Sequence, residues 1–182
     1  TMGKELKAKK FKKVDSLSAK DKTLLMVYII YQIHIRLPMR NDLAGAEAIT
    51  KRAYNKLTTE DKKAKNYLVV EKGKMFFVLN KYKTAKKYEE LKIDVPKDLE
   101  KLLRTYIKIN GMGVLFKSST GKALTRNALS QLLIKYSKKY MDGKSISTTI
   151  LRKIVLSDKF ADLKKEQEEM AKVTGHSVET MN

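Results

Sequence analysis

Four cationic or imidazole side chains stand where the sequence pattern changes, and their chemistry suits a phosphodiester. Arg40 follows Pro38 at the end of an apolar stretch, and Lys83 lies in a lysine-rich connection. Arg152 lies in an apolar helical pattern, and His176 follows a glycine. Two guanidinium groups can bind the non-bridging oxygens of a phosphodiester and stabilise the charge that develops there. A lysine can protonate a leaving oxygen, and a histidine can transfer a proton. The four residues therefore predict phosphodiester chemistry, provided that the fold brings them together.

The charge balance favours a polyanionic partner. The 182 residues include 40 Lys and Arg against 20 Asp and Glu, a formal net charge of +20. Each phosphate that a cation neutralises releases condensed counterions, so a nucleic acid is the polyanion that the charge favours. The absence of cysteine excludes a disulfide scaffold, a thiolate zinc site and a cysteine nucleophile, and two histidines cannot form an all-histidine metal cage. We expect neither a metal nor an organic cofactor.

No segment of the sequence indicates a membrane partner. The longest apolar run, residues 24–35, is interrupted by Gln32 and His34 and is too short to span a bilayer. The beginning of the chain lacks the apolar stretch of a signal peptide. We therefore expect the run over 24–35 to be a buried helix.

The pattern of apolar residues predicts an α+β fold. Residues 1–15 read as a basic tail or interdomain linker, and residues 16–182 as one domain. A helix begins after Ser18 and ends at Pro38. The β-rich runs 67–70 and 75–79, joined by a hairpin, and the alternating run 91–95 predict a three-stranded antiparallel sheet.

Helices are expected again after Pro96. Apolar stripes predict one helix that Gly111 ends, a second that begins near Thr125, a third over 150–155 and a fourth before Gly175. Arg152 is expected on a helix with few exposed positions, where an unpaired charge is costly. An anion partner and a structural salt bridge are equally good explanations of this arginine.

Four motifs resemble boxes of the catalytic domain of tyrosine recombinases and integrases. Residues 37–43 (LPMRNDL) resemble the first-arginine box, and residues 83–87 (KTAKK) resemble the turn that carries the family's lysine. Residues 149–153 (TILRK) resemble the His-x-x-Arg box, and residues 174–180 (TGHSVET) resemble the Gly-His box. Within this family, the Pro-x-Arg-x-Asp and Leu-Arg-Lys patterns of these motifs are most similar to those of divergent members from mobile elements and large eukaryotic DNA viruses. The resemblance spans residue 18 to the end of the chain.

The resemblance implies roles for individual residues. Arg40 and Arg152 would clamp the scissile phosphate, Lys83 would act as general acid, and His176 would assist phosphate binding or proton transfer. Thr149 occupies the position of the box histidine and can donate a hydrogen bond to a phosphate oxygen. The acid Asp42 comes two residues after the first arginine, where the family usually has its acid three residues after it. Additional contacts with the DNA backbone are expected from Lys81, Lys86, Arg126 and Lys153.

The resemblance also implies a fold and an activity. The fold is a mostly helical catalytic domain with a small three-stranded antiparallel sheet. The activity is site-specific cleavage and rejoining of DNA, as in integration or recombination, through a 3′-phosphotyrosyl intermediate without a cofactor. None of the nine tyrosines follows His176, so we expect a catalytic domain truncated before its nucleophile and inactive as printed. The partner that the resemblance implies is double-stranded DNA. The fragment would be a monomer, and the full-length protein a homo-oligomer on that DNA. The location would be intracellular, wherever the target DNA is, and the nucleus or a viral factory if the source is a eukaryotic virus.

Two other functions stay open at this stage. A type IB topoisomerase uses a similar set of arginine, lysine, histidine and tyrosine but relaxes supercoils as a monomer. A non-enzymatic basic domain that binds nucleic acid would need none of these roles, because Arg40 can cap a helix C-terminus and Lys83 can be a solvated turn residue. The choice of Lys83 over Lys81, Lys86 or Lys87 rests on the Lys-Thr spacing alone.

Overall fold

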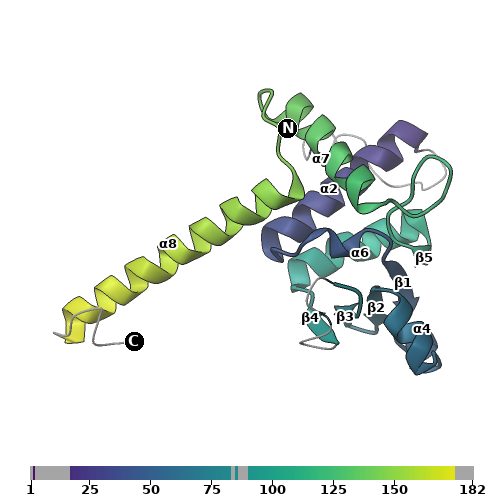
Figure 1. Cartoon of the computed structure of the whole chain (residues 1–182), viewed down its shortest axis with the longest axis horizontal. Helices are drawn as coiled ribbons and strands as arrows, with labels where there is room; N and C mark the ends of the chain where they lie inside the picture. The colour runs from purple at the N-terminus through teal and green to yellow at the C-terminus, as the bar shows by residue number, and fades with distance from the viewer. Residues whose placement is uncertain (1, 3–16, 83–84, 86–89, 175–182) are drawn as a thin grey trace.

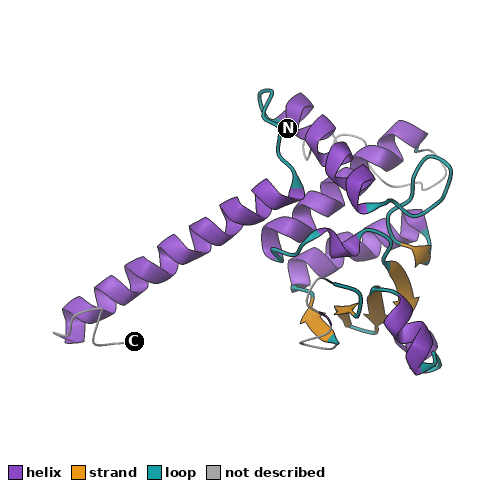
Figure 2. Ribbon diagram, viewed as in Figure 1, coloured by secondary structure: helices purple, strands orange, loops and turns teal. Residues whose placement is uncertain are grey.

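The fold is α+β, with a mixed sheet on one side of a group of helices (Figures 1 and 2). The computed structural model describes residue 2 and residues 17–82, 85 and 90–174, the last four as backbone only. Of the basic tail predicted over residues 1–15, the described part is Met2, whose side chain is buried in the main core. None of the described helices combines the length and the apolar character that crossing a lipid bilayer requires.

Helix α2 (Ala19–Arg36) forms the centre of the main core. It begins where the Ser18 side chain accepts a hydrogen bond from the Asp21 backbone N–H, as the sequence predicts. Nine of its 18 residues are buried, because α6, α7 and α8 all pack against it. The helix ends at Arg36 with Leu37 as its C-cap, next to Pro38, and the short 3₁₀ helix η2 (Asn41–Leu43) follows.

The sheet has five strands in the order β4-β3-β2-β1-β5, so the prediction of a three-stranded sheet is wrong. The predicted antiparallel meander is present as β2 (Tyr67–Glu71), β3 (Lys74–Leu79) and β4 (Leu91–Asp94). The two additional strands are β1 (Glu47–Thr50), which runs parallel to β2, and β5 (Gly113–Val114), which runs antiparallel to β1. Neither strand shows the β-rich run or the alternation of apolar and polar residues that predicts β2, β3 and β4, and pairing with distant segments defines them.

Two short helices connect the parallel strands β1 and β2. Helix α3 (Lys51–Asn55) and helix α4 (Thr59–Ala64) begin at threonine N-caps, Thr50 and Thr58. A small second core of residues from α3, β2 and β3 covers one face of the sheet. It comprises Tyr54, Tyr67, Val69, Phe76 and Val78. The other face of the sheet packs against the main core around α2.

Three further helices complete the described chain. Helix α6 (Lys97–Asn110) ends at Gly111, whose φ of 81° favours glycine, and α7 (Arg126–Tyr140) begins at the N-cap Thr125, both as predicted. Helix α8 (Thr148–Thr174) is one helix of 27 residues, and the prediction of two separate helices in this region is wrong. No glycine or proline interrupts it, and its second half extends away from the body (Figure 1).

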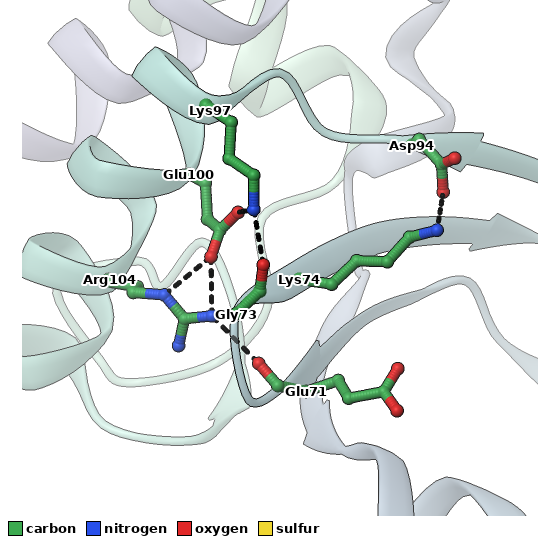
Figure 3. A network of polar contacts seen from close by, with 7 residues as sticks. All are labelled: Glu71, Gly73, Lys74, Asp94, Lys97, Glu100 and Arg104. Carbon is green, nitrogen blue, oxygen red and sulfur yellow. Dashed lines mark hydrogen bonds and ion pairs between the residues drawn. The ribbon is translucent and has the colours of Figure 1, made fainter.

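A polar network joins the β2–β3 hairpin to α6 (Figure 3). The Glu100 carboxylate is nearly buried and accepts hydrogen bonds from the Arg104 guanidinium, with Arg104 Nε at 2.9 Å. Arg104 also donates to the Glu71 carbonyl at 2.8 Å, and Lys97 donates to the Gly73 carbonyl. The network therefore holds the hairpin, and with it the sheet, on the helix.

We predict that Glu100→Gln lowers the free energy of unfolding by about 1 kcal/mol at pH 7 and by less in acid. The hydrogen bonds from Arg104, followed by those from Lys97, hold the pKa of Glu100 below its ordinary value of 4.5. A lowered pKa stabilises the fold above pH 4.5, and that stabilisation is lost as the pH falls through the pKa of the folded protein. Chemical denaturation between pH 3 and 7 measures the difference. Asp94→Asn is the control because its carboxylate, 66% exposed beside Lys74, contributes little.

Candidate functional site

Three segments that are distant in the sequence meet at one cavity of about 300 Å³. They are the turn after α2, the first residue of α7 and the beginning of α8. We call this cavity the arginine cavity, and its lining residues are Arg40, Asn41, Asp42, Arg126, Thr148, Thr149 and Arg152. Three of the residues predicted as catalytic, Arg40, Thr149 and Arg152, thus lie together, and the predicted backbone contact Arg126 lies beside them.

The end of α2 positions Arg40. The buried Met39 anchors the turn to the core, while the Arg40 backbone is extended and its side chain is exposed. Asn41 then fixes the turn to α7, because its Nδ2 donates to the Arg126 carbonyl at 3.2 Å and to Ser130 Oγ at 2.7 Å. The turn therefore presents Arg40 to solvent at a defined place beside α7.

The first turns of α8 position Thr149 and Arg152. Leu151 and Val155 are buried against the core, which sets the rotation of the helix. Residues three apart lie on one helix face, so Thr149 and Arg152 are neighbours at the cavity. Arg152 is half-buried, but Ile150 and Ile154 are 44% exposed, so the expectation of a helix with few exposed positions is wrong. Of the apolar residues in these first turns, Leu151 and Val155 pack against the core.

An ion pair between Asp42 and Arg126 forms one wall of the cavity. Asp42 Oδ1 lies 2.9 Å from Arg126 Nη2, and the two side chains are 8% and 60% exposed. Burial raises the pKa of Asp42 above its ordinary value, although Arg126, Arg40 and Arg152 each act to lower it. The acid after the first arginine thus pairs with Arg126.

The cavity has an excess of positive charge. It is lined by three guanidinium groups and one carboxylate. Within residues 17–82, 85 and 90–170, the side chains of Arg40 and Arg152 make no ion pair and no hydrogen bond. Two unneutralised guanidinium groups and the Thr149 hydroxyl, all at one cavity, can bind a phosphate group by charge-assisted hydrogen bonds. In the same part of the chain no three His, Asp or Glu side chains cluster as metal ligands.

A second cavity, of about 490 Å³, adjoins the first, because both are lined by Asp42 and Arg126. We call it the lysine cavity; its other lining residues are Ala44, Gly45, Ala64, Lys65, Asn66, Lys81 and Tyr82. The Lys65 amine is paired with Glu47 at 2.5 Å, whereas the Lys81 amine makes no ion pair within the described residues. Arg126 and Lys81 therefore extend the cationic surface from α8 to the end of β3.

Asn66 ties the turn that carries Asp42 to the end of β3 that carries Lys81. Its buried side chain accepts hydrogen bonds from the backbone N–H groups of Asn80 and Lys81 at 2.8 and 2.7 Å. Its Nδ2 donates to the Asp42 carbonyl at 2.6 Å and to the Lys81 carbonyl at 3.0 Å. Sequence reasoning missed this residue because an asparagine before a strand carries no signal beyond a turn.

The structure does not place all of the predicted site. Lys83, Lys86 and His176 lie outside the described residues, so the predicted convergence can be described for Arg40, Thr149 and Arg152. Lys153 is exposed on α8 and lines neither cavity. Asn41 and Thr148 line the arginine cavity and were missed, because a single polar residue beside a predicted site residue gives no signal of its own.

Comparison with known proteins adds no relative. The chain matches no protein-family model, and no curated protein and no solved structure is significantly similar to it.

We predict that Arg126→Ala destabilises the protein by about 1 kcal/mol at pH 7, and by less as the pH falls toward 4. Without the guanidinium, the buried Asp42 carboxylate loses its ion pair at 2.9 Å, and its pKa, which burial already raises, rises further. Protonation in acid then removes the unpaired charge. Denaturant unfolding between pH 4 and 7 measures the effect.

The double variant Asp42→Asn/Arg126→Ala is the matched control. It removes both charges, so it should lose less stability at pH 7 than the sum of the two single variants. Two results would contradict the pairing of Asp42 with Arg126. One is a loss of stability in Arg126→Ala that is the same at pH 4 and pH 7, and the other is a loss in the double variant equal to the sum of the losses in the two single variants.

Proposed function

We propose that this chain supplies the phosphate-binding site of an enzyme that cleaves and rejoins DNA in the manner of tyrosine recombinases. The observation that supports it is the meeting of Arg40, Arg152 and Thr149 at one cavity, from two boxes that are far apart in the sequence. The motif resemblance requires that the two arginines meet, whereas a basic domain that binds nucleic acid only through a charged surface does not require it. The surplus of positive charge fits a phosphodiester better than a neutral substrate.

The chemistry assigned to the cavity is stabilisation of the pentacoordinate phosphorus. Arg40 and Arg152 would each donate N–H groups to the non-bridging oxygens, and the Thr149 hydroxyl would donate to one of them. Thr149 cannot act as a base near neutral pH, so proton transfer would belong to other groups. Positioning and charge stabilisation supply most of the acceleration in phosphoryl transfer.

The covalent step needs a nucleophile and a general acid. In the family a tyrosine hydroxyl attacks the phosphorus and loses its proton, while the bond from phosphorus to the 5′-oxygen breaks and that oxygen takes up a proton. The proposal assigns the phosphate site to this chain. In the family the attacking tyrosine comes after the Gly-His box, and none of the nine tyrosines of these 182 residues follows His176. Lys83 is the proposed acid, and Lys81, two residues before it, lines the lysine cavity.

We predict that Arg152→Ala abolishes covalent attachment to DNA in a longer form of the protein that carries a tyrosine after His176. The guanidinium stabilises charge that develops only in the transition state, so the loss should exceed about 100-fold. A nicked duplex, from which the 5′-product diffuses away, traps the adduct for a denaturing gel. Lys159 is exposed further along α8 and lines neither cavity, so Lys159→Ala removes the same charge from the same helix and should change attachment by less than about threefold.

The outcomes separate the candidate functions. Attachment at a normal rate in Arg152→Ala would remove this arginine from the site. If the longer wild-type protein forms no adduct yet binds the duplex, the chain belongs to a non-enzymatic nucleic-acid-binding protein. Relaxation of supercoiled DNA without a paired target site would instead favour a type IB topoisomerase.

A second prediction concerns the path of the DNA backbone along the lysine cavity. Lys81→Ala should weaken binding of a short duplex equally for unrelated sequences and reduce the slope of log affinity against log salt concentration by about 1. The Lys81 amine lines the cavity without an ion pair among the described residues, so a phosphate can be its partner. Fluorescence anisotropy at several salt concentrations measures the slope. Lys108→Ala, an exposed lysine on α6 outside both cavities, is the control, and equal slopes for the two variants would exclude the contact.

A further inference from the structure

The second half of α8 carries apolar side chains that no described residue covers. We call residues 156–167 of this helix the arm, and they extend away from the body (Figure 1). Every residue from 157 to 167 is exposed, including Phe160 and Leu163, whose exposed fractions are 66% and 53%. Single exposed apolar residues are ordinary, whereas a row of them on one element marks an interaction surface. The arm therefore has the composition of an interface.

The apolar residues of the arm share one face of the helix, which we call the arm stripe. They follow one another at the intervals of the two core positions of a coiled-coil heptad, four and then three residues: Leu156, Phe160 and Leu163. Gln167 occupies the next core position, where a polar residue helps to specify the register of a helix pair. Leu151 and Val155, which hold α8 on the core, face about a third of a turn away. A second helix can therefore pack on the arm stripe while α8 stays in place.

The charged residues beside the arm stripe favour a second copy of the same helix. Lys159 and Glu166 are seven residues apart, so they occupy the same flanking position of successive heptads. Two antiparallel arms that pack Phe160 against the partner's Leu163 bring Lys159 beside the partner's Glu166. The two-fold axis repeats the contact, so the pair contains two ion pairs between the copies. The arm is therefore complementary in charge to itself when the second copy runs in the opposite direction.

Other arrangements of two arms bring like charges together. Sliding the antiparallel pair by seven residues one way sets Glu166 beside the partner's Glu166, and sliding it the other way sets Lys159 beside the partner's Lys159. A parallel pair sets Lys159 beside the partner's Lys164. In the favoured register Lys164 faces the partner's Ser157 instead, and its amine is 4.0 Å from Glu168 of its own helix. Repulsion in the alternatives makes the register specific.

From this pattern we infer that the arm is a self-association surface, through which two copies of the chain form an antiparallel helix pair. The central layers join residues of opposite copies: Phe160 with Leu163, and Leu156 with Gln167. The contact uses the same patch on both copies, so it closes as a dimer and leaves no free end for a filament. The resemblance alone implies a monomeric fragment, whereas the arm supplies a surface for pairing. The inference uses no residue of the arginine cavity and is independent of the proposed function.

Sedimentation velocity of the 182-residue chain tests this surface. An interface of a few helical turns is small, so we expect the dimer to appear between about 10 μM and 1 mM. Phe160→Ser and Leu163→Ser should remain monomeric over that range and keep the stability of the wild-type monomer, because both side chains are already exposed. Ile154→Ser is the matched control: Ile154 is 44% exposed on the same helix but faces away from the arm stripe, so this variant should dimerise like the wild type.

An exchange of charges tests the orientation. Lys159→Glu sets carboxylates beside each other at both ion pairs and should weaken the dimer about tenfold, and Glu166→Lys should do the same with amines. The combined variant Lys159→Glu/Glu166→Lys exchanges the two charges and should restore the wild-type dimer. Lys165→Glu is the control, because it makes the same change of charge on the opposite face of the arm and should change dimerisation by less than about threefold.

Three results would overturn the inference. The first is a chain that stays monomeric up to about 1 mM. The second is a dimer that Phe160→Ser and Leu163→Ser leave intact, because a different surface would then form it. The third is a combined charge variant that dimerises as weakly as Lys159→Glu, because the antiparallel register would then be wrong. Attachment to DNA is measured well below these concentrations, where the chain is monomeric, so all three results leave the proposed function standing and Lys159→Ala remains a control for it.

Discussion

Burial of α2 is the constraint from which the geometry of the candidate site follows. Nine residues of this helix are buried among α6, α7 and α8, and the Tyr31 hydroxyl donates to the Leu133 carbonyl on α7 at 2.7 Å. A helix enclosed in this way cannot rotate or slide without opening the core. Its abrupt end beside Pro38 therefore delivers Arg40 to one fixed place, beside the start of α7 and the first turns of α8. The same packing encloses His34 and leaves its Nε2 without a hydrogen-bond partner among the described residues.

The arginine cavity, beside this apolar core, carries positive charge that the described residues do not fully neutralise. Many of the 40 cationic residues are solvated, yet two guanidinium groups at the arginine cavity have no ion-pair partner among the described residues. The single carboxylate of the cavity is committed to Arg126, and burial raises its pKa despite three nearby arginines. The fold thus accepts an electrostatic cost at this position. Such a cost is typical of sites that bind a charged ligand, because the ligand supplies the missing countercharge.

The fold was predictable where the signal lies within one segment. Ser18 and Thr125 cap helices, Gly111 ends one, and the meander of β2, β3 and β4 follows from β-rich runs around a hairpin. Strands β1 and β5 were missed because hydrogen bonds to distant segments, not a local pattern, define them. The continuity of α8 was missed because its weak apolar spacing was divided into two stripes, although no residue breaks the helix.

The sequence by itself determined the chemistry that is available. The chain is strongly basic and has no cysteine, Arg40 follows the end of a helix, and Arg152 lies in a motif that has Thr149 in place of the box histidine. It also determined the order of the boxes, which carries the resemblance to tyrosine recombinases. Tertiary structure alone decided that Arg40, Thr149 and Arg152 share a cavity, that Asp42 pairs with Arg126, and that Asn66 joins the strand end to the turn. The physical reason is that these contacts link residues from separate elements. The distances between those residues are set by the packing of α2 against α7 and α8, and no local sequence pattern encodes that packing.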